Sequence, residues 1–233
     1  MSEMAKFAHS VREAAKGAAQ SLREPKVFNR KKLIYPVRAF IKPFDTFSDI
    51  KSENMGSMLI ANVIIFLFFV TSILEFFFKG FIFNDNKLTN FNILVQLAYS
   101  VVLVVLWSVT NWAVCTLMDG EGTMSQIWIV TAYSLMPLII SRILTVMLSN
   151  FLVFEESVFL TLISGLGMVF LFVFLFVGSL TIHQYTVLKT LISMAVTVLG
   201  ILAIIFLFVL FFSIIQQMYG FITTVSTEVI NKS

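Results

Sequence analysis

Five long stretches of this sequence contain almost no charged residues, and each is long enough to cross a lipid bilayer. They cover about 57–78, 92–117, 125–148, 158–182 and 188–216. About 20 apolar residues in a helix span the roughly 30 Å of hydrocarbon in a bilayer. Lipid offers no hydrogen-bond partners to the backbone, so stretches of this length fold as helices. The sequence therefore predicts an all-α fold, a polytopic membrane helix bundle with five transmembrane helices preceded by amphipathic N-terminal helices.

Charged residues divide the 233-residue chain into regions. Residues 1–56 hold eleven of the 16 Lys and Arg, although charged residues make up only 12% of the chain. We expect a basic N-terminal region with amphipathic or interfacial helices over 1–56, the five-span domain over 57–216, and a short exposed tail over 217–233. Counting Lys and Arg in the connecting segments gives twelve on the N-terminal side and three on the other. The positive-inside rule then places the N-terminus in the cytoplasm and the C-terminus outside.

The N-terminal region carries the candidate residues for docking to the membrane or to a partner protein. An alanine-rich helical stripe runs over 2–23, a basic run follows Pro25, and a short amphipathic helix with phenylalanine on one face follows Pro43. Basic residues beside a membrane are attracted to anionic lipid. The alternatives are a solvated helix over 2–23 and a basic run that only fixes topology. The candidate docking residues are Phe7, Val11, Lys26, Arg30, Lys31, Lys32, Phe44 and Phe47.

Arg142 is the one basic residue deep inside a predicted span, and charges are costly in lipid. Glu75, near the end of the first span, is expected at a similar depth. We interpret the two as a structural ion pair that clips two helices together. The alternative is a polar path through the membrane that Arg142, Asn111, Gln96 and Pro137 would line, as in a small permease or channel.

Searches for catalytic and ligand motifs find none. The sequence lacks a His-Glu-x-x-His metal motif, a Gly-x-Ser-x-Gly nucleophile elbow and a phosphate-binding loop. Asp119 and Glu121 are too few carboxylates for a cation site, and His183 has no ligand partner at a useful spacing. We therefore expect no enzymatic activity, no cofactor and no metal. A basic segment beside a membrane is explained without nucleic-acid binding, so nucleic acid is not expected as a partner.

Two motifs carry a family resemblance. The first is Asp119-Gly-Glu-Gly-Thr followed by Ala132-Tyr-Ser-Leu-x-Pro137, and the second is His183-Gln-Tyr185 with Lys189 before the last span. Together with the amphipathic segment that begins at Pro43, before the first span, they make the chain resemble the Yip (Ypt-interacting protein) family over most of its length. The compact form is similar to the bacterial-type branch.

The resemblance implies five spans, a cytoplasmic N-terminus and an exposed C-terminus. For eukaryotic members it implies a role in membrane trafficking with Rab GTPase partners. Those members carry Asp-Leu-Tyr-Gly-Pro before the membrane, where this chain has Asp45-Thr-Phe-Ser48, a departure that weakens the expectation of Rab binding. The resemblance assigns no catalytic residue.

Three functions are compatible with these features. The first is a non-enzymatic membrane scaffold or accessory subunit that docks another membrane protein or complex, for example a transporter, through its N-terminal arm. The second is the small permease or channel with a polar path near Arg142, and the third is a trafficking factor. A homo-oligomer is compatible with each. The expected location is a bacterial plasma membrane, with a eukaryotic ER or Golgi membrane as the alternative.

Overall fold

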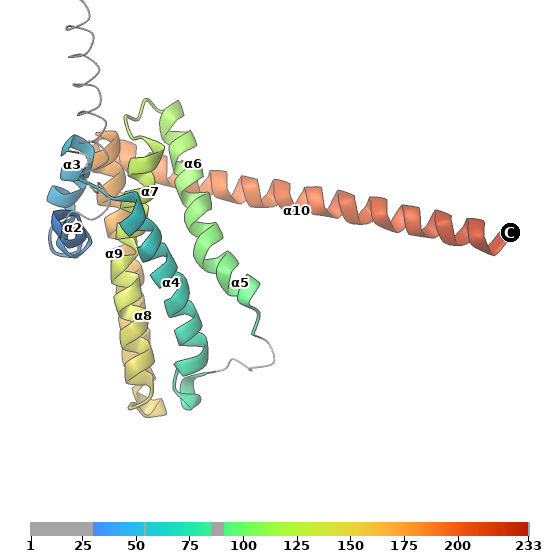
Figure 1. Cartoon of the computed structure of the whole chain (residues 1–233), viewed down its shortest axis with the longest axis horizontal. Helices are drawn as coiled ribbons and strands as arrows, with labels where there is room; N and C mark the ends of the chain where they lie inside the picture. The colour runs from blue at the N-terminus through green and yellow to red at the C-terminus, as the bar shows by residue number, and fades with distance from the viewer. Residues whose placement is uncertain (1–29, 54, 85–90, 233) are drawn as a thin grey trace, which may run out of the picture.

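The computed structural model describes residues 30–53, 55–84 and 91–232, and every regular element within these ranges is helical. Five helical stretches of this described part are long and apolar enough to cross a membrane. They are Met58–Phe78, Ile93–Leu117, Met124–Ser149, Phe154–His183 and Val187–Thr224. The prediction of an all-α bundle with five membrane-spanning helices is therefore confirmed. Figure 1 shows the main elements, which are α2 (Arg30–Ile41), α3 (Pro43–Glu53), α4 (Met58–Phe78), α5 (Ile93–Leu97), α6 (Leu103–Leu117), α7 (Met124–Ser134), α8 (Met136–Ser149), α9 (Ser157–His183) and α10 (Val187–Lys232).

Two of the five spans are interrupted. In the second span a π-helical segment, η3 (Ala98–Val102), lies between α5 and α6. In the third span α7 ends at Ser134 and α8 begins at Met136. Pro137 explains this break, because proline has no backbone N–H and its ring clashes with the carbonyl four residues earlier, at Tyr133. This break lies in the middle of the most buried span.

The third span forms the centre of the bundle, with α9 packed along α8 and α7 and with α4 on another side. Tyr133 is fully buried there. Glycines on α9 let the helices approach closely. A Cβ atom at Gly167 would overlap the side chain of Ser141 on α8, and one at Gly178 would overlap Val130 on α7. Small residues at such crossings allow the van der Waals contact that drives helix association in lipid.

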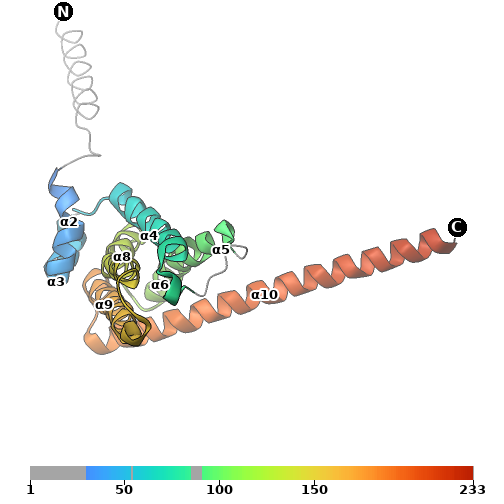
Figure 2. The same cartoon turned by 90° about the horizontal axis from the view of Figure 1, so that it is seen from below.

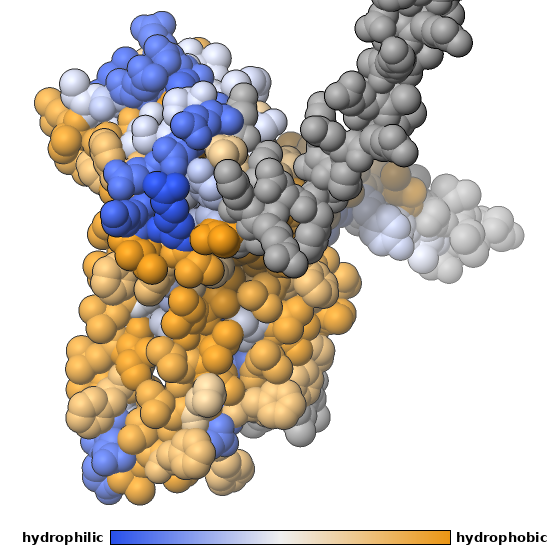
Figure 3. Space-filling model, turned by 60° about the vertical axis from the view of Figure 1, so that its left-hand side comes forward, coloured by the Kyte–Doolittle hydropathy of each residue, from blue (hydrophilic) through white to orange (hydrophobic). Residues whose placement is uncertain are grey.

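Helices α2 and α3 form an N-terminal arm, which we define as residues 34–53. Asp49 of α3 holds the two helices of the arm together. Its Oδ2 lies 3.0 Å from Arg38 Nη1 of α2 and accepts a hydrogen bond from the Tyr35 hydroxyl of α2 at 3.4 Å. α3 packs on α9, with Phe47 and Ile50 in the core. Figure 3 shows a hydrophilic cap at this end of the molecule, above a broad apolar surface. We call this the arm end of the bundle.

The last helix, α10, extends well past Gln216, where the fifth span was expected to end, and reaches Lys232. Its first turns pack on α6 and α9, with Gly200 placed closely against Thr110. Its remaining length projects away from the bundle (Figures 1 and 2), and no residue of its most apolar 18-residue stretch is buried. The expected tail over 217–233 therefore continues the helix wherever the structure describes it.

Candidate functional site

The arm presents an apolar stripe whose side chains are exposed and do not belong to the buried core of the bundle. Ile34, Val37 and Ile41 of α2, together with Phe44 at the start of α3, are all more than half exposed, and Ile41 reaches 72%. Their spacing of three to four residues places the α2 members on one helix face. The opposite face of α2 holds Tyr35 and Ala39, which are buried. We call the four exposed residues the arm stripe.

The structure separates the two phenylalanines that were expected to dock together. Phe44 belongs to the arm stripe, but Phe47 is completely buried and lies near Gly178 of α9. The expected docking surface is corrected here to omit Phe47, because its side chain holds the arm on the bundle and cannot reach a partner. Phe7, Val11 and Lys26 lie outside the described residues. Arg30, Lys31 and Lys32 begin α2, and side chains are described from Ile34 onward.

The Asp119–Thr123 turn joins α6 to α7 at the arm end. Asp119 adopts a left-handed conformation with φ 57°, and Thr123 caps α7 in a reciprocal pair with Gln126. Lys51 of α3 reaches this turn, with its Nζ donating to the Glu121 backbone oxygen at 3.0 Å and lying 3.3 Å from Glu121 Oε2. The turn is therefore a contact point for the arm.

His183 lies directly behind this turn. The sequence offered no ligand partner for it, and the structure buries it, with only 2% of the residue exposed. Its Nδ1 accepts a hydrogen bond from the Gly122 N–H at 3.3 Å, which makes Nε2 the protonated nitrogen, 3.4 Å from Asn111 Oδ1. Asn111 in turn donates to Thr197 on α10. One hydrogen-bonded chain thus connects the turn, α9, α6 and α10, and His183 acts as a neutral structural residue.

Tyr185, in the short connection between α9 and α10, packs beside His183 and the hydrogen-bonded chain that it belongs to. Its Oη donates to the backbone oxygens of Cys115 at 3.0 Å and Met118 at 3.1 Å, and its ring stacks on His183. Burial, helped by the neighbouring Cys115, raises the pKa of Tyr185 to about 12. The neutral phenol is the form that can donate to these carbonyls.

Replacing Tyr185 with phenylalanine should remove about 1 kcal/mol of stability, because the carbonyls of Cys115 and Met118 lose their shared donor, although the Cys115 oxygen still accepts from the Met118 and Gly120 N–H groups. The pH dependence has a defined sign. The folded-state pKa, about 12, lies above the ordinary value of 10, so the stabilisation is fully present below pH 10 and is lost as pH rises towards 12. Unfolding measured from pH 8 to 12 should show a smaller alkaline loss for Tyr185→Phe than for the unmodified chain. Parallel curves would contradict this role of the phenol.

Arg142 and Glu75 lie on neighbouring helices, α8 and α4, far from the arm end. Arg142 Nε lies 3.5 Å from Glu75 Oε2, and the guanidinium sits over the Phe68 ring at 4.5 Å. The two charged side chains are 27% and 33% exposed. Arg142 Nη1 is buried and has no hydrogen-bond partner within the described part of the chain. The structure therefore brings together the two residues proposed as a helix clip.

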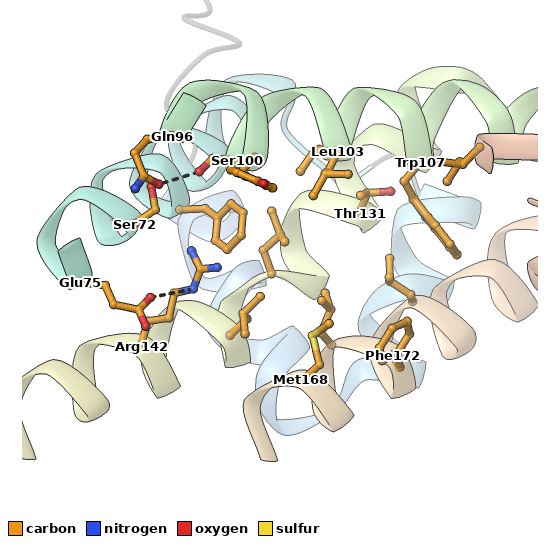
Figure 4. Close-up of a pocket in the computed structure, with 18 of the residues that line it drawn as sticks. Ser72, Glu75, Gln96, Ser100, Leu103, Trp107, Thr131, Arg142, Met168 and Phe172 are labelled. Carbon is orange, nitrogen blue, oxygen red and sulfur yellow. Dashed lines mark hydrogen bonds and ion pairs between the residues drawn. The ribbon is translucent and has the colours of Figure 1, made fainter. Parts of the chain in front are cut away.

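A cavity of about 620 Å³ lies beside this ion pair. Its lining includes Arg142, Glu75 and Gln96 at one end and Trp107 at the other (Figure 4). Of the residues weighed for a polar path, Arg142 and Gln96 line this cavity. Asn111 instead borders a separate space of about 10 Å³ next to His183. Pro137 lines neither of these two spaces.

No group of three or more His, Cys, Asp or Glu residues that could hold a metal ion occurs in the described ranges. Cys115 is buried and its thiol is free. The arrangement of polar groups is one of hydrogen-bonded helix contacts, with a charged pair beside a largely apolar cavity.

A family model described as the Yip1 domain matches residues 37–225, which is most of the chain. The chain belongs to the Yip1 family. Yip1 proteins are membrane proteins and are not known as enzymes. Searches of curated proteins and of solved structures found no match. The Yip1 match begins inside α2, so it includes most of the arm, the Asp119–Thr123 turn and all five spans.

Sequence reasoning missed three features around the site of this Yip1 domain. The first is the burial of His183, whose partners lie 61 and 72 residues away in the sequence. The second is the cavity, which residues of seven α-helices, α4 to α10, and of the π-helical segment line together. The third is the interruption of the second span by η3, which no proline or glycine in the sequence of that span predicts. Gln96, which the sequence offered as a candidate lining residue of a polar path, was the signal that pointed towards this region.

Proposed function

We propose that this Yip1 protein is a non-enzymatic membrane scaffold or accessory subunit whose N-terminal arm docks another membrane protein or complex, for example a transporter. The observation that carries the proposal is the arm stripe. A helix pair held firmly on the bundle presents four large apolar side chains outward, at the polar end of the molecule. Apolar anchors surrounded by polar residues are typical of protein-binding surfaces.

The basic composition of residues 1–56 supports placing the arm in the cytoplasm, with the C-terminus on the other side. The departure from the eukaryotic Asp-Leu-Tyr-Gly-Pro motif at 45–48 supports assignment to the bacterial branch of the family and to a plasma membrane. A homo-oligomer is compatible with this proposal, because a second copy can join the same assembly.

The cavity geometry favours the scaffold over a small permease. Beyond Trp107, the space beside Asn111 and His183 amounts to about 10 Å³. One water molecule needs roughly 10–15 Å³. The larger cavity therefore does not continue as a polar path towards the arm end, and a solute that entered near Arg142 would meet packed side chains.

The test is a pull-down of the full chain in gentle detergent, with mass spectrometry, beside a chain lacking residues 1–30. A stoichiometric partner should be captured, and Val37→Glu/Ile41→Glu should reduce its recovery about tenfold or more, because two interface anchors are lost. Ser48→Glu, at an exposed position of α3 outside the stripe, is the control for added negative charge and should retain the partner.

Two outcomes would count against the scaffold. One is a clean homo-oligomer with no stoichiometric partner, with and without residues 1–30. The other is equal recovery of a partner by the stripe variant and the Ser48→Glu control, which would move the docking surface off the arm. Flux of a solute in proteoliposomes that Arg142→Leu abolishes would instead support the permease.

A further inference from the structure

The cavity beside Arg142 is built like a site for an amphiphile. Most of its wall is apolar and comes from α4, α6, α8 and α9, while its charged groups gather at one end (Figure 4). Leu103 on α6 and Met168 and Phe172 on α9 line it from opposite sides, and all three are exposed. The cavity therefore opens towards the surface that faces lipid. Its volume, about 620 Å³, falls within the ~300–1,000 Å³ typical of ligand sites.

The charged end has an unused donor and an excess of positive charge. Arg142 and Lys79 both line the cavity, and Glu75 is the single acidic residue in its lining. Arg142 Nη1 is buried without a hydrogen-bond partner among the described residues. Lys79 likewise has no ion-pair partner there. Guanidinium and ammonium groups with free donors bind phosphate oxygens well, so this end of the cavity suits an anion.

The position of this end matches the depth of lipid headgroups. Lys79 directly follows α4, and Glu75 lies one turn earlier. The ends of α4 and α8 are joined here, because the Gly80 N–H donates to Ser149 Oγ at 2.8 Å. From Gln96 to Trp107 the cavity follows the second span for eleven residues, or about 16 Å at 1.5 Å per residue. One leaflet of the hydrocarbon core is about 15 Å thick.

We propose that this cavity binds one acyl chain of an anionic phospholipid, with the phosphate at Arg142 and Lys79 and the chain end near Trp107. The cavity is a second site, distinct from the arm stripe and independent of the proposed docking function. Glu75 holds the guanidinium through Nε, so the terminal nitrogens of Arg142 are the donors for the phosphate. The exposed rim lets a lipid enter sideways from the bilayer.

The test uses the full chain in phosphatidylcholine vesicles that contain a small fraction of lipid brominated in mid-chain. Bromine quenches tryptophan fluorescence on contact, and the part of the signal lost in Trp107→Phe isolates Trp107. Brominated phosphatidylglycerol should quench Trp107 at about fivefold lower mole fraction than brominated phosphatidylcholine, because the quaternary ammonium of choline is repelled by the net positive end of the cavity and phosphatidylglycerol carries no such cation. Lys79→Gln and Arg142→Gln should abolish this preference.

Lys189→Gln is the matched control, because it removes a lysine at the arm end of the bundle that does not line the cavity. It should keep the preference for the anionic lipid. Equal quenching of Trp107 by the two brominated lipids would overturn the proposal, as would the same loss in Lys189→Gln as in Lys79→Gln. Displacement of the lipid by excess inorganic phosphate would assign the site to a free anion instead. Lys79→Gln decides the matter if Arg142→Gln fails to fold.

Discussion

Gly167→Leu is expected to destabilise the bundle by about 3 kcal/mol, the largest effect of any single change considered for this chain. The reason is contact between helices α8 and α9. A Cβ atom at position 167 would already overlap Ser141 Oγ and Cβ, and the Pro137 carbonyl oxygen lies 3.5 Å away. A leucine would therefore push α9 off the third span, which is the most buried of the five spans in the described part of the chain. Unfolding in mixed micelles with increasing SDS measures the loss.

Gly165 offers a control on the same helix, two residues earlier. A Cβ atom there would meet nothing within 4 Å. Gly165→Leu should therefore leave the unfolding midpoint unchanged or raise it slightly, since leucine has the higher helix propensity. If both leucine variants unfolded at the same SDS fraction, close packing of α9 on α8 would not be a main source of stability.

The second large effect is expected from separating Arg142 and Glu75. Glu75→Gln should cost about 2 kcal/mol, because the guanidinium loses a charged partner in a mostly apolar setting. Partial exposure of both side chains keeps this below the ~3–5 kcal/mol of fully buried pairs. Arg142→Met should cost a similar amount, because the carboxylate then lacks its partner.

A double-mutant cycle tests whether the pair acts as a clip. Glu75→Gln/Arg142→Met should be more stable than the sum of the single effects predicts, by about 1 kcal/mol. Both singles and the double variant would be unfolded in the same micelles. Strict additivity would mean that the two charges contribute separately, and the clip would have to be abandoned.

Much of the fold follows from local sequence patterns. The five spans depend on long apolar stretches, and the break before Pro137 depends on one residue, so neither needs knowledge of the tertiary structure. Arg142 and Glu75 were predicted to pair only because their estimated depths in the membrane agree, and the structure places Arg142 Nε 3.5 Å from Glu75 Oε2. Depth was enough because α4 and α8 are also neighbours.

The remaining features depend on which segments meet. The pattern after Pro43 puts Phe44 and Phe47 on one face, but the close approach of Gly178 creates the space that buries Phe47 alone. The burial of His183 requires the Asp119–Thr123 turn to fold over it. The cavity exists because α6 and α9 line opposite sides of one space, which no local pattern encodes. The length of α10 was missed because polar Gln216 and Gln217 looked like a span end.

The packing at the arm end also bears on how this family diverges. A Cβ atom at Gly120 would lie 2.5 Å from Tyr185 Oη, and one at Gly122 would lie 2.6 Å from His183 Cε1. The two glycines and the two rings therefore occupy one shared volume, although about 60 residues separate them in the chain. A residue larger than glycine at position 120 or 122 would therefore be tolerated only if the ring that it approaches, Tyr185 or His183, were replaced by a smaller side chain. Among relatives these positions are expected to co-vary, so that two short motifs are inherited as one unit.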